Sequence, residues 1–159
     1  MKDLYGLDEA EWAIWRGFVA MRRSLDRALE QRLQADAGIS AAEFDVLVSL
    51  DRAEDHQLRA GALAESLGWE KSRISHQVSR MAARGLVERA ECPTDARGTW
   101  VVLASAGADA LAAATCGYVE VLRSTFLSPL GESDKRALRA IADRVLELEP
   151  DRRRAPVPA

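Results

Sequence analysis

The fold is decided by one stretch of the sequence, residues 60–85, which reads AGALAESLGWEKSRISHQVSRMAARG. Gly68 separates two helix-like segments in this stretch, and Gly85 closes the second of them. We expect helices at residues 60–67 and 71–84, because glycine readily takes the left-handed conformation that follows a helix end. Two short helices joined by a tight glycine-containing turn are typical of a helix-turn-helix.

The residues that follow Gly85 indicate a β-hairpin. In residues 86–89 and 99–103 the apolar period changes from helical to two, which is the signal of a strand. The segment between them, CPTDARG at residues 92–98, consists largely of turn formers. A helix-turn-helix followed by a hairpin predicts a winged helix, with its wing over residues 87–103.

Long helices are expected on both sides of this lobe. Apolar residues recur at helical spacing over residues 9–35, 108–127 and 133–148. A further helix opens at a capping box formed by Ser40 and Glu43 and ends near Arg52, and residues 53–57 read as a loop. The predicted fold class is mainly α with a small β-hairpin wing, in a single domain of residues 1–149. Its winged helix-turn-helix lobe covers about 57–104, its long terminal helices cover about 9–37 and 108–148, and residues 150–159 are predicted to be a disordered tail.

The predicted helix at residues 71–84 separates its side chains by chemistry. At about 100° per residue, Ile74, Val78 and Met81 share one side, which we expect to face the core. The opposite side carries hydrogen-bonding side chains and no carboxylate, with Ser75 and Gln77 on its flanks, whereas an ordinary solvated helix face mixes both signs of charge. Arginine pairs with guanine edges, glutamine with adenine, and serine or histidine with bases or phosphates. The candidate DNA contacts on this helix are Lys71, Ser72, Arg73, Ser75, His76, Gln77, Ser79 and Arg80.

The predicted hairpin tip supplies two further candidates, Asp95 and Arg97. An arginine on a narrow turn can enter a minor groove, where the negative potential is enhanced. A carboxylate two residues away can orient that guanidinium through a bidentate pair. Asp95 could equally bond its own backbone in the turn, and the two roles are compatible.

The charge of the chain is locally reversed in this region. The 159 residues carry a net charge of −3. Residues 69–100 hold six Lys and Arg against four Asp and Glu, whereas the rest of the chain holds 16 against 21. A basic stretch inside an acidic chain is typical of a DNA-reading module on a larger body.

Several classes of protein are disfavoured. No apolar run reaches the roughly 18 residues of a membrane span, and the N-terminus lacks a signal-peptide pattern, so we expect a cytoplasmic protein without a membrane partner. Two cysteines and two histidines argue against a disulfide scaffold and a structural zinc site, so we expect neither metal nor cofactor. The chain has no GxSxG, P-loop or HExxH motif, and we do not expect an enzyme.

Five blocks of the sequence, in this order and spacing, resemble the MarR family of transcription regulators. They are LAESLG at 63–68, KSRISHQV at 71–78, RGLVER at 84–89, DARG at 95–98 and LASAG at 103–107. The resemblance implies a homodimer in which the terminal helices form the interface and two winged-helix lobes bind a near-palindromic DNA operator. It also implies a repressor released by a small phenolic or carboxylic effector bound between the dimer helices and the lobe. The oxidation-sensing branch of the family uses a cysteine in the first long helix, and this chain has none there.

We therefore predict a sequence-specific DNA-binding transcription regulator, a ligand-responsive repressor acting as a homodimer. The effector site is not readable from the sequence; Trp12 and Trp15 are weak candidates, since both also suit a core or dimer interface. One alternative is a regulator switched by oxidation of Cys92. Another is a winged-helix module that binds a protein instead of DNA.

Overall fold

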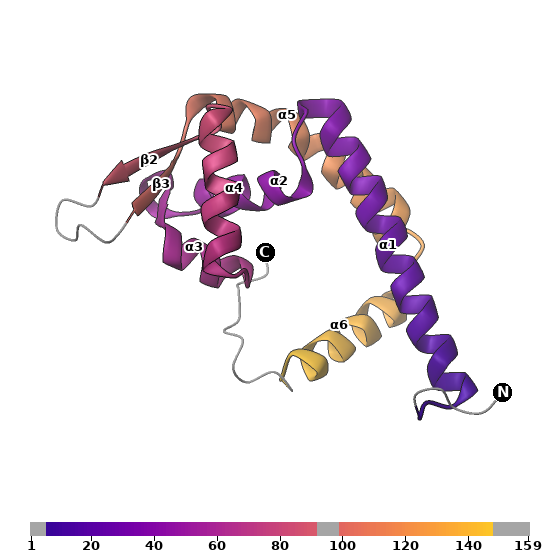
Figure 1. Ribbon diagram of the computed structural model, residues 1–159. Coiled ribbons are helices and arrows are strands. Elements are labelled where there is room, and N and C mark those ends of the chain that lie inside the picture. Colours follow the sequence, from indigo (N-terminus) through magenta and orange to yellow (C-terminus); the bar gives the residue numbers. More distant parts are fainter. Residues whose placement is uncertain (1–5, 92–98, 148–159) are drawn as a thin grey trace.

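The computed structural model describes residues 6–91 and 99–147, which form a winged-helix lobe beside a pair of long helices (Figure 1). Strands β1 (Gln57–Arg59), β3 (Thr99–Leu103) and β2 (Val87–Glu91) pair in that order, both pairs antiparallel. The predicted fold class is confirmed. In chain order the elements are α1 (Glu9–Ala37), α2 (Ala41–Asp51), a 3₁₀ turn (Glu54–His56), β1 (Gln57–Arg59), α3 (Ala60–Leu67), α4 (Lys71–Ala83), β2 (Val87–Glu91), β3 (Thr99–Leu103), α5 (Ser105–Leu122), a π-helical turn (Arg123–Leu127) and α6 (Glu132–Glu147).

Local signals in the sequence explain where the helices begin and end. Ser40 and Glu43 form both hydrogen bonds of the predicted capping box at the start of α2. Gly68 and Gly85 follow α3 and α4 with φ of 63° and 71°, in the left-handed region that glycine tolerates best. These are the ends that the sequence predicts.

The core of the lobe lies between α2, α3, α4 and the sheet. Ile74, Val78 and Met81 are buried there, as predicted from the helical period. The aromatic rings of Phe44 on α2 and Tyr118 on α5 stack with their centroids 4.5 Å apart, which connects the lobe to the helix pair. The other fully buried large side chains are Leu33, Ile39, Val46, Leu47, Leu50, Leu63 and Val101.

Helices α1 and α5 run side by side, and α6 leads away from them (Figure 1). Gly117 of α5 leaves room for two side chains of α1, because a Cβ there would lie 1.9 Å from Asp36 Oδ2 and 2.2 Å from Arg32 Nε. Arg32 pairs with Asp36 at 2.6 Å and reaches Glu120 of α5 at 3.2 Å. Salt bridges thus fill the space that a side chain at position 117 would need.

Two expectations about secondary structure were wrong. Residues 53–57 were expected to form a loop, but they contain a 3₁₀ turn and the start of β1, which pairs with β3 through Leu58 and Val101. A strand of three residues is too short to show a period of two. Helix α5 begins at Ser105, before the expected residue 108, and the last turn of the expected helix is π-helical. The hairpin turn at 92–98 and the predicted tail at 150–159 lie outside the described residues.

Candidate nucleic-acid interface

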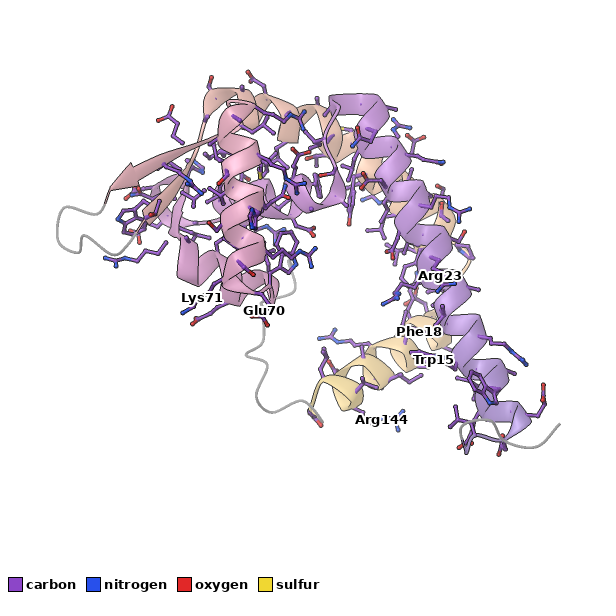
Figure 2. The ribbon with its side chains drawn as sticks, in the orientation of Figure 1. Trp15, Phe18, Arg23, Glu70, Lys71 and Arg144 are labelled. Carbon is purple, nitrogen blue, oxygen red and sulfur yellow. The ribbon has the colours of Figure 1, made fainter. Side chains whose placement is uncertain are left out.

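Helix α4 presents a polar, acid-free face to solvent. Its apolar side is buried, and no Asp or Glu occurs between Lys71 and Ala83. Both Lys71 and its exposed neighbour Glu70 lie at the N-terminal end of the helix (Figure 2). The predicted contact residues that are exposed are Lys71, Ser72, Arg73, Ser75, His76, Ser79 and Arg80.

Gln77 departs from the prediction that it flanks the exposed face. Its side chain is 3% exposed, and its amide oxygen accepts a hydrogen bond from the Arg80 guanidinium. The physical reason is helical spacing, since residue 77 is three after Ile74 and four before Met81, which places it within the buried stripe. Gln77 is therefore buried and bonded to Arg80, and its side chain does not face solvent.

Arg73 is held by a neighbouring aromatic ring. Its guanidinium carbon lies 3.8 Å from the ring centroid of Trp69, which occupies the turn between α3 and α4. A cation over the face of tryptophan is attracted by the ring quadrupole. The stack restricts the rotamers of Arg73, so less entropy would be lost when the guanidinium meets a base edge.

Strand β2 supplies a cation that the sequence analysis did not single out. Arg89 donates to the backbone oxygen of Ser75 at 3.1 Å and to Ser79 Oγ at 2.9 Å. The Ser79 hydroxyl in turn donates to the Ser75 backbone oxygen at 2.8 Å. Arg89 thus connects the wing to the middle of α4. This contact depends on how β2 packs against α4, which cannot be predicted from local sequence patterns.

A second arginine, on β1, contacts the wing at its base. Arg59 of β1 lies over the ring of Trp100, its cross-strand partner on β3, at 5.3 Å from the centroid. The last described pair of the hairpin joins Glu91 to Thr99. Asp95, Arg97 and Cys92 lie beyond this pair, outside the described residues.

Known proteins share both the sequence pattern and the fold of this chain. A profile described as the MarR family matches residues 37–98. Sco3205, a MarR family transcriptional regulator from Streptomyces coelicolor solved in complex with DNA, is 31% identical with a TM-score of 0.86. That match covers 91% of this chain and 95% of the relative. The chain belongs to the MarR family of transcription regulators.

Two further solved structures share the MarR fold. AbsC, a MarR family transcriptional regulator from Streptomyces coelicolor, is 31% identical with a TM-score of 0.79, covering 89% of this chain and 97% of that one. PcaV, a regulator from the same organism solved with its natural ligand, is 22% identical with a TM-score of 0.67, covering 80% and 89%. A search of curated protein sequences gave no match. Membership in the MarR family confirms the prediction of a DNA-binding transcription regulator, a class of protein without enzymatic activity.

A cavity of about 460 Å³ lies where α1, α2 and α5 of this MarR protein meet. Desolvation raises the pKa of the Asp45 carboxyl in its wall, and the charge of Arg73 partly opposes that rise. Burial, together with the charges of Asp45 and Asp26, raises the pKa of Tyr118. The lining residues are Asp26, Arg27, Leu29, Glu30, Ala41, Phe44, Asp45 and Tyr118.

The aromatic candidates for an effector site lie elsewhere. Trp12 is half-buried and Trp15 is exposed on the N-terminal half of α1, and neither lines this cavity or a second, more open one beside Cys116. Cys116 is an exposed free thiol. Within residues 6–91 and 99–147, no cluster of three or more His, Cys, Asp or Glu is placed to hold a metal. No helix there is long and apolar enough to cross a membrane.

Proposed function

We propose that this protein is a repressor that binds a near-palindromic operator as a homodimer, with α4 of each copy in the major groove. The observation that carries the proposal is the acid-free exposed face of α4. Arg73, His76 and Arg80 on that face can bond base edges and phosphates. The DNA complex of the 31%-identical relative supports the same assignment.

The test starts from a pool of random duplexes from which the protein selects its own ligand. We expect an inverted repeat whose half-site centres lie about 10 base pairs apart, one helical turn. Fluorescence anisotropy should show binding to it about 1,000-fold or more tighter than to a scrambled duplex. A reporter gene placed behind the selected sequence should be less active when the protein is present. Equal affinity for selected and scrambled duplexes would contradict DNA reading and favour the protein-binding alternative.

The proposal of a homodimer rests on large apolar side chains that are exposed to solvent in a single chain. Trp15 and Phe18 stack on each other at 5.9 Å on α1, and Trp15 is 53% exposed (Figure 2). On α6, which buries none of its residues within the chain, Val145 is 58% exposed. A second copy of the chain can cover both helices through one twofold axis. The exposed large hydrophobics on these helices are Ile14, Trp15, Phe18, Met21, Ile141, Val145 and Leu146.

The effector is proposed to bind in the cavity between α1, α2 and α5. Its volume falls in the range of small-molecule sites, and Phe44 and Tyr118 provide aromatic walls. Arg27 is the cation among its lining residues and is the expected partner of a ligand carboxylate. A ligand releases DNA only if it binds the DNA-free arrangement more tightly than the DNA-bound one.

Salicylate is the probe for this proposal, because it combines an aromatic ring with a carboxylate. At millimolar concentration it should weaken operator binding by the parent protein, and Arg27→Gln should remove that response while leaving DNA affinity unchanged. Arg52→Gln, on an exposed arginine outside the cavity lining, is the matched control. If salicylate changes neither operator binding nor the melting temperature, the protein has a different effector or none.

A further inference from the structure

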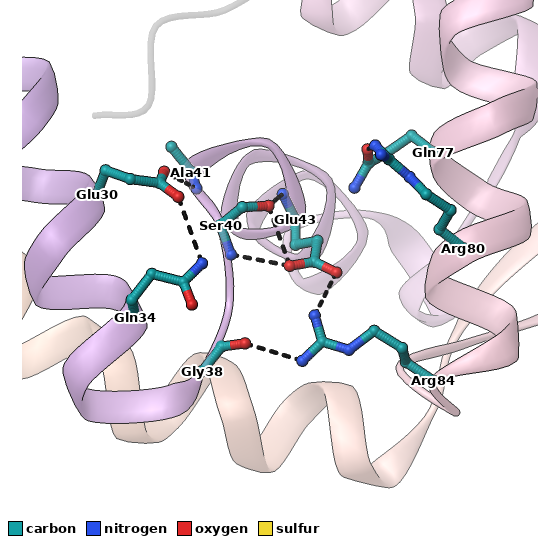
Figure 3. Close-up of polar contacts among 9 residues, drawn as sticks. All are labelled: Glu30, Gln34, Gly38, Ser40, Ala41, Glu43, Gln77, Arg80 and Arg84. Carbon is teal, nitrogen blue, oxygen red and sulfur yellow. Dashed lines mark hydrogen bonds and ion pairs between the residues drawn. The ribbon is translucent and has the colours of Figure 1, made fainter.

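One guanidinium joins the end of α4 to the junction between α1 and α2 (Figure 3). Arg84, the residue that ends α4, pairs its Nη1 with Glu43 Oε1 at 2.6 Å. Its Nη2 donates to the backbone oxygen of Gly38 at 2.8 Å. Glu43 belongs to α2, and Gly38 is the residue that ends α1. Arg84 therefore holds three helices together at one point.

The carboxylate of Glu43 is shared between two roles. Its Oε2 accepts from the backbone N–H of Ser40 at 2.8 Å and from Ser40 Oγ at 3.0 Å, which caps α2. Only Oε1 faces Arg84. Since a glutamine at the same position also completes a capping box, the cap does not require a negative charge. The charge is needed by the pairing with Arg84.

The same junction is held from the α1 side. Glu30 Oε2 accepts the backbone N–H of Ala41 at 2.7 Å, and Glu30 Oε1 accepts from Gln34 Nε2 at 3.3 Å (Figure 3). Both Glu30 and Ala41 line the cavity beneath α1. Glu30 in the cavity wall thus binds the first turn of α2, and Glu43 in that same turn binds Arg84 at the end of α4.

The burial of this pair indicates what it contributes. The Glu43 side chain is 8% exposed but that of Arg84 is 46% exposed, and an ion pair that is open to solvent on one side contributes little to stability. The pair is therefore expected to add little to the free energy of unfolding. Its geometry is specific, however, since the planar guanidinium meets Glu43 through one nitrogen and the Gly38 carbonyl through the other, which permits only a narrow range of helix positions.

We propose that Glu43 and Arg84 are positioning residues that fix the orientation of α4 relative to the α1–α5 helix pair. In a dimer held together by its terminal helices, that orientation sets the distance between the two copies of α4. The pair would then determine which half-site spacing the protein accepts. This inference rests on the proposed dimeric operator binding.

The test compares affinities for the selected inverted repeat and for duplexes whose half-sites are one or two base pairs closer or farther apart. Glu43→Gln keeps the cap and loses the ion pair, and Arg84→Gln loses both contacts of the guanidinium. Each should weaken binding at the parent spacing by about tenfold, a typical effect for coupled residues, and flatten the preference among spacings. Affinity for a scrambled duplex should stay unchanged. Arg84→Lys, which keeps a cation near Glu43, should restore part of the preference.

Ser40→Ala is the matched control, because it removes a hydroxyl of the cap and leaves the pair between Glu43 and Arg84. It should lower the melting temperature while keeping the sharp spacing preference of the parent. If Glu43→Gln, Arg84→Gln and Ser40→Ala all lower the melting temperature and all keep that preference, the pair is only structural and the inference is overturned alone. If the parent binds every spacing equally, the proposed operator binding and this inference fall together.

Discussion

Glu43 carries a charge at an almost buried position, and its pKa has a measurable consequence. Burial disfavours the carboxylate, but hydrogen bonds from Ser40 and Arg84 and the charge of Arg84 outweigh it, so the pKa of Glu43 lies below the ordinary value of a glutamate, 4.5. A carboxyl whose pKa is lower in the folded state stabilises the protein above the unfolded pKa. That contribution is lost as the pH falls through the folded pKa.

We therefore expect Glu43→Gln to flatten the loss of stability below about pH 4.5, since the amide does not titrate. Thermal melts of parent and variant between about pH 3 and pH 7 give the measurement. Parallel curves for parent and Glu43→Gln would contradict the assigned pKa.

Arginines on the helix and on the wing are expected to contribute differently to DNA binding. Arg73→Ala should lose about 1–3 kcal/mol on the selected operator and relax specificity at one base position, if its guanidinium reads a base edge. Arg97→Ala should weaken binding to many sequences alike and lower the log–log salt slope by about 0.9. If the Asp95 carboxylate orients the Arg97 guanidinium, as the sequence suggests, Asp95→Ala should be a weaker form of Arg97→Ala, because the cation itself is kept.

Anisotropy titrations with operator and scrambled duplexes at several salt concentrations separate these outcomes. Trp69→Leu provides a further check, since it removes the ring beneath Arg73 and keeps the charge. It should reproduce part of the Arg73→Ala loss on the operator. Parent-like binding by Arg97→Ala at every salt concentration would mean that the wing makes no contact with DNA.

At the scale of elements, two helical glycines differ in their surroundings: Gly107 lies against another backbone, and Gly61 does not. A Cβ at Gly107 would lie 2.1 Å from the backbone oxygen of Leu86, where α5 crosses the base of β2. A Cβ at Gly61, on the exposed side of α3, would meet nothing within 4 Å. Gly107 is therefore required by the approach of two backbones, and Gly61 is not.

Gly107→Ala should destabilise the protein by about 1–3 kcal/mol, because a backbone oxygen has to move. Gly61→Ala should stabilise it slightly, by less than the roughly 0.5–1 kcal/mol that is usual in a helix interior, because Gly61 lies in the first turn of α3. Urea denaturation of both variants under the same conditions gives the comparison. Similar effects of the two alanines would contradict the packing of α5 against the base of the wing.

The predictability of each element depends on whether its signal is local. The ends of α3 and α4 and the start of α2 could be predicted, because Gly68, Gly85 and the Ser40–Glu43 box act within one turn of chain. The pairing of β1 with β3 could not, since its partner lies more than 40 residues away. The exposure of six α4 side chains besides Lys71 could be predicted from the helical period. The same period also places Gln77 between Ile74 and Met81 on the buried side, so its burial was predictable as well. Arg84 and Arg89 act across elements, so their roles needed coordinates.

At the scale of the whole molecule, the expected dimer can be tested without truncating the chain. Val145→Glu on α6 and Phe18→Glu on α1 place charges where we expect a second copy to pack, and each should shift the protein toward monomer. Ala62→Glu, on an exposed position of α3, is the control and should leave the association unchanged. Light scattering on size-exclusion fractions reports the mass. A parent protein that is monomeric at all concentrations would contradict the dimer.

The pairing of α1 with α5 also has a consequence for biosynthesis. Helix α1 is complete at Ala37, but its partner begins only at Ser105, after the whole winged-helix lobe. At about 5–20 residues per second, a ribosome needs several seconds to supply that partner. Throughout this interval the nascent chain carries an amphipathic helix whose apolar side lacks α5, its main partner in the chain. Translation products that stop inside the lobe should therefore be substrates for chaperones and proteases, whereas products that extend past α5 should escape them.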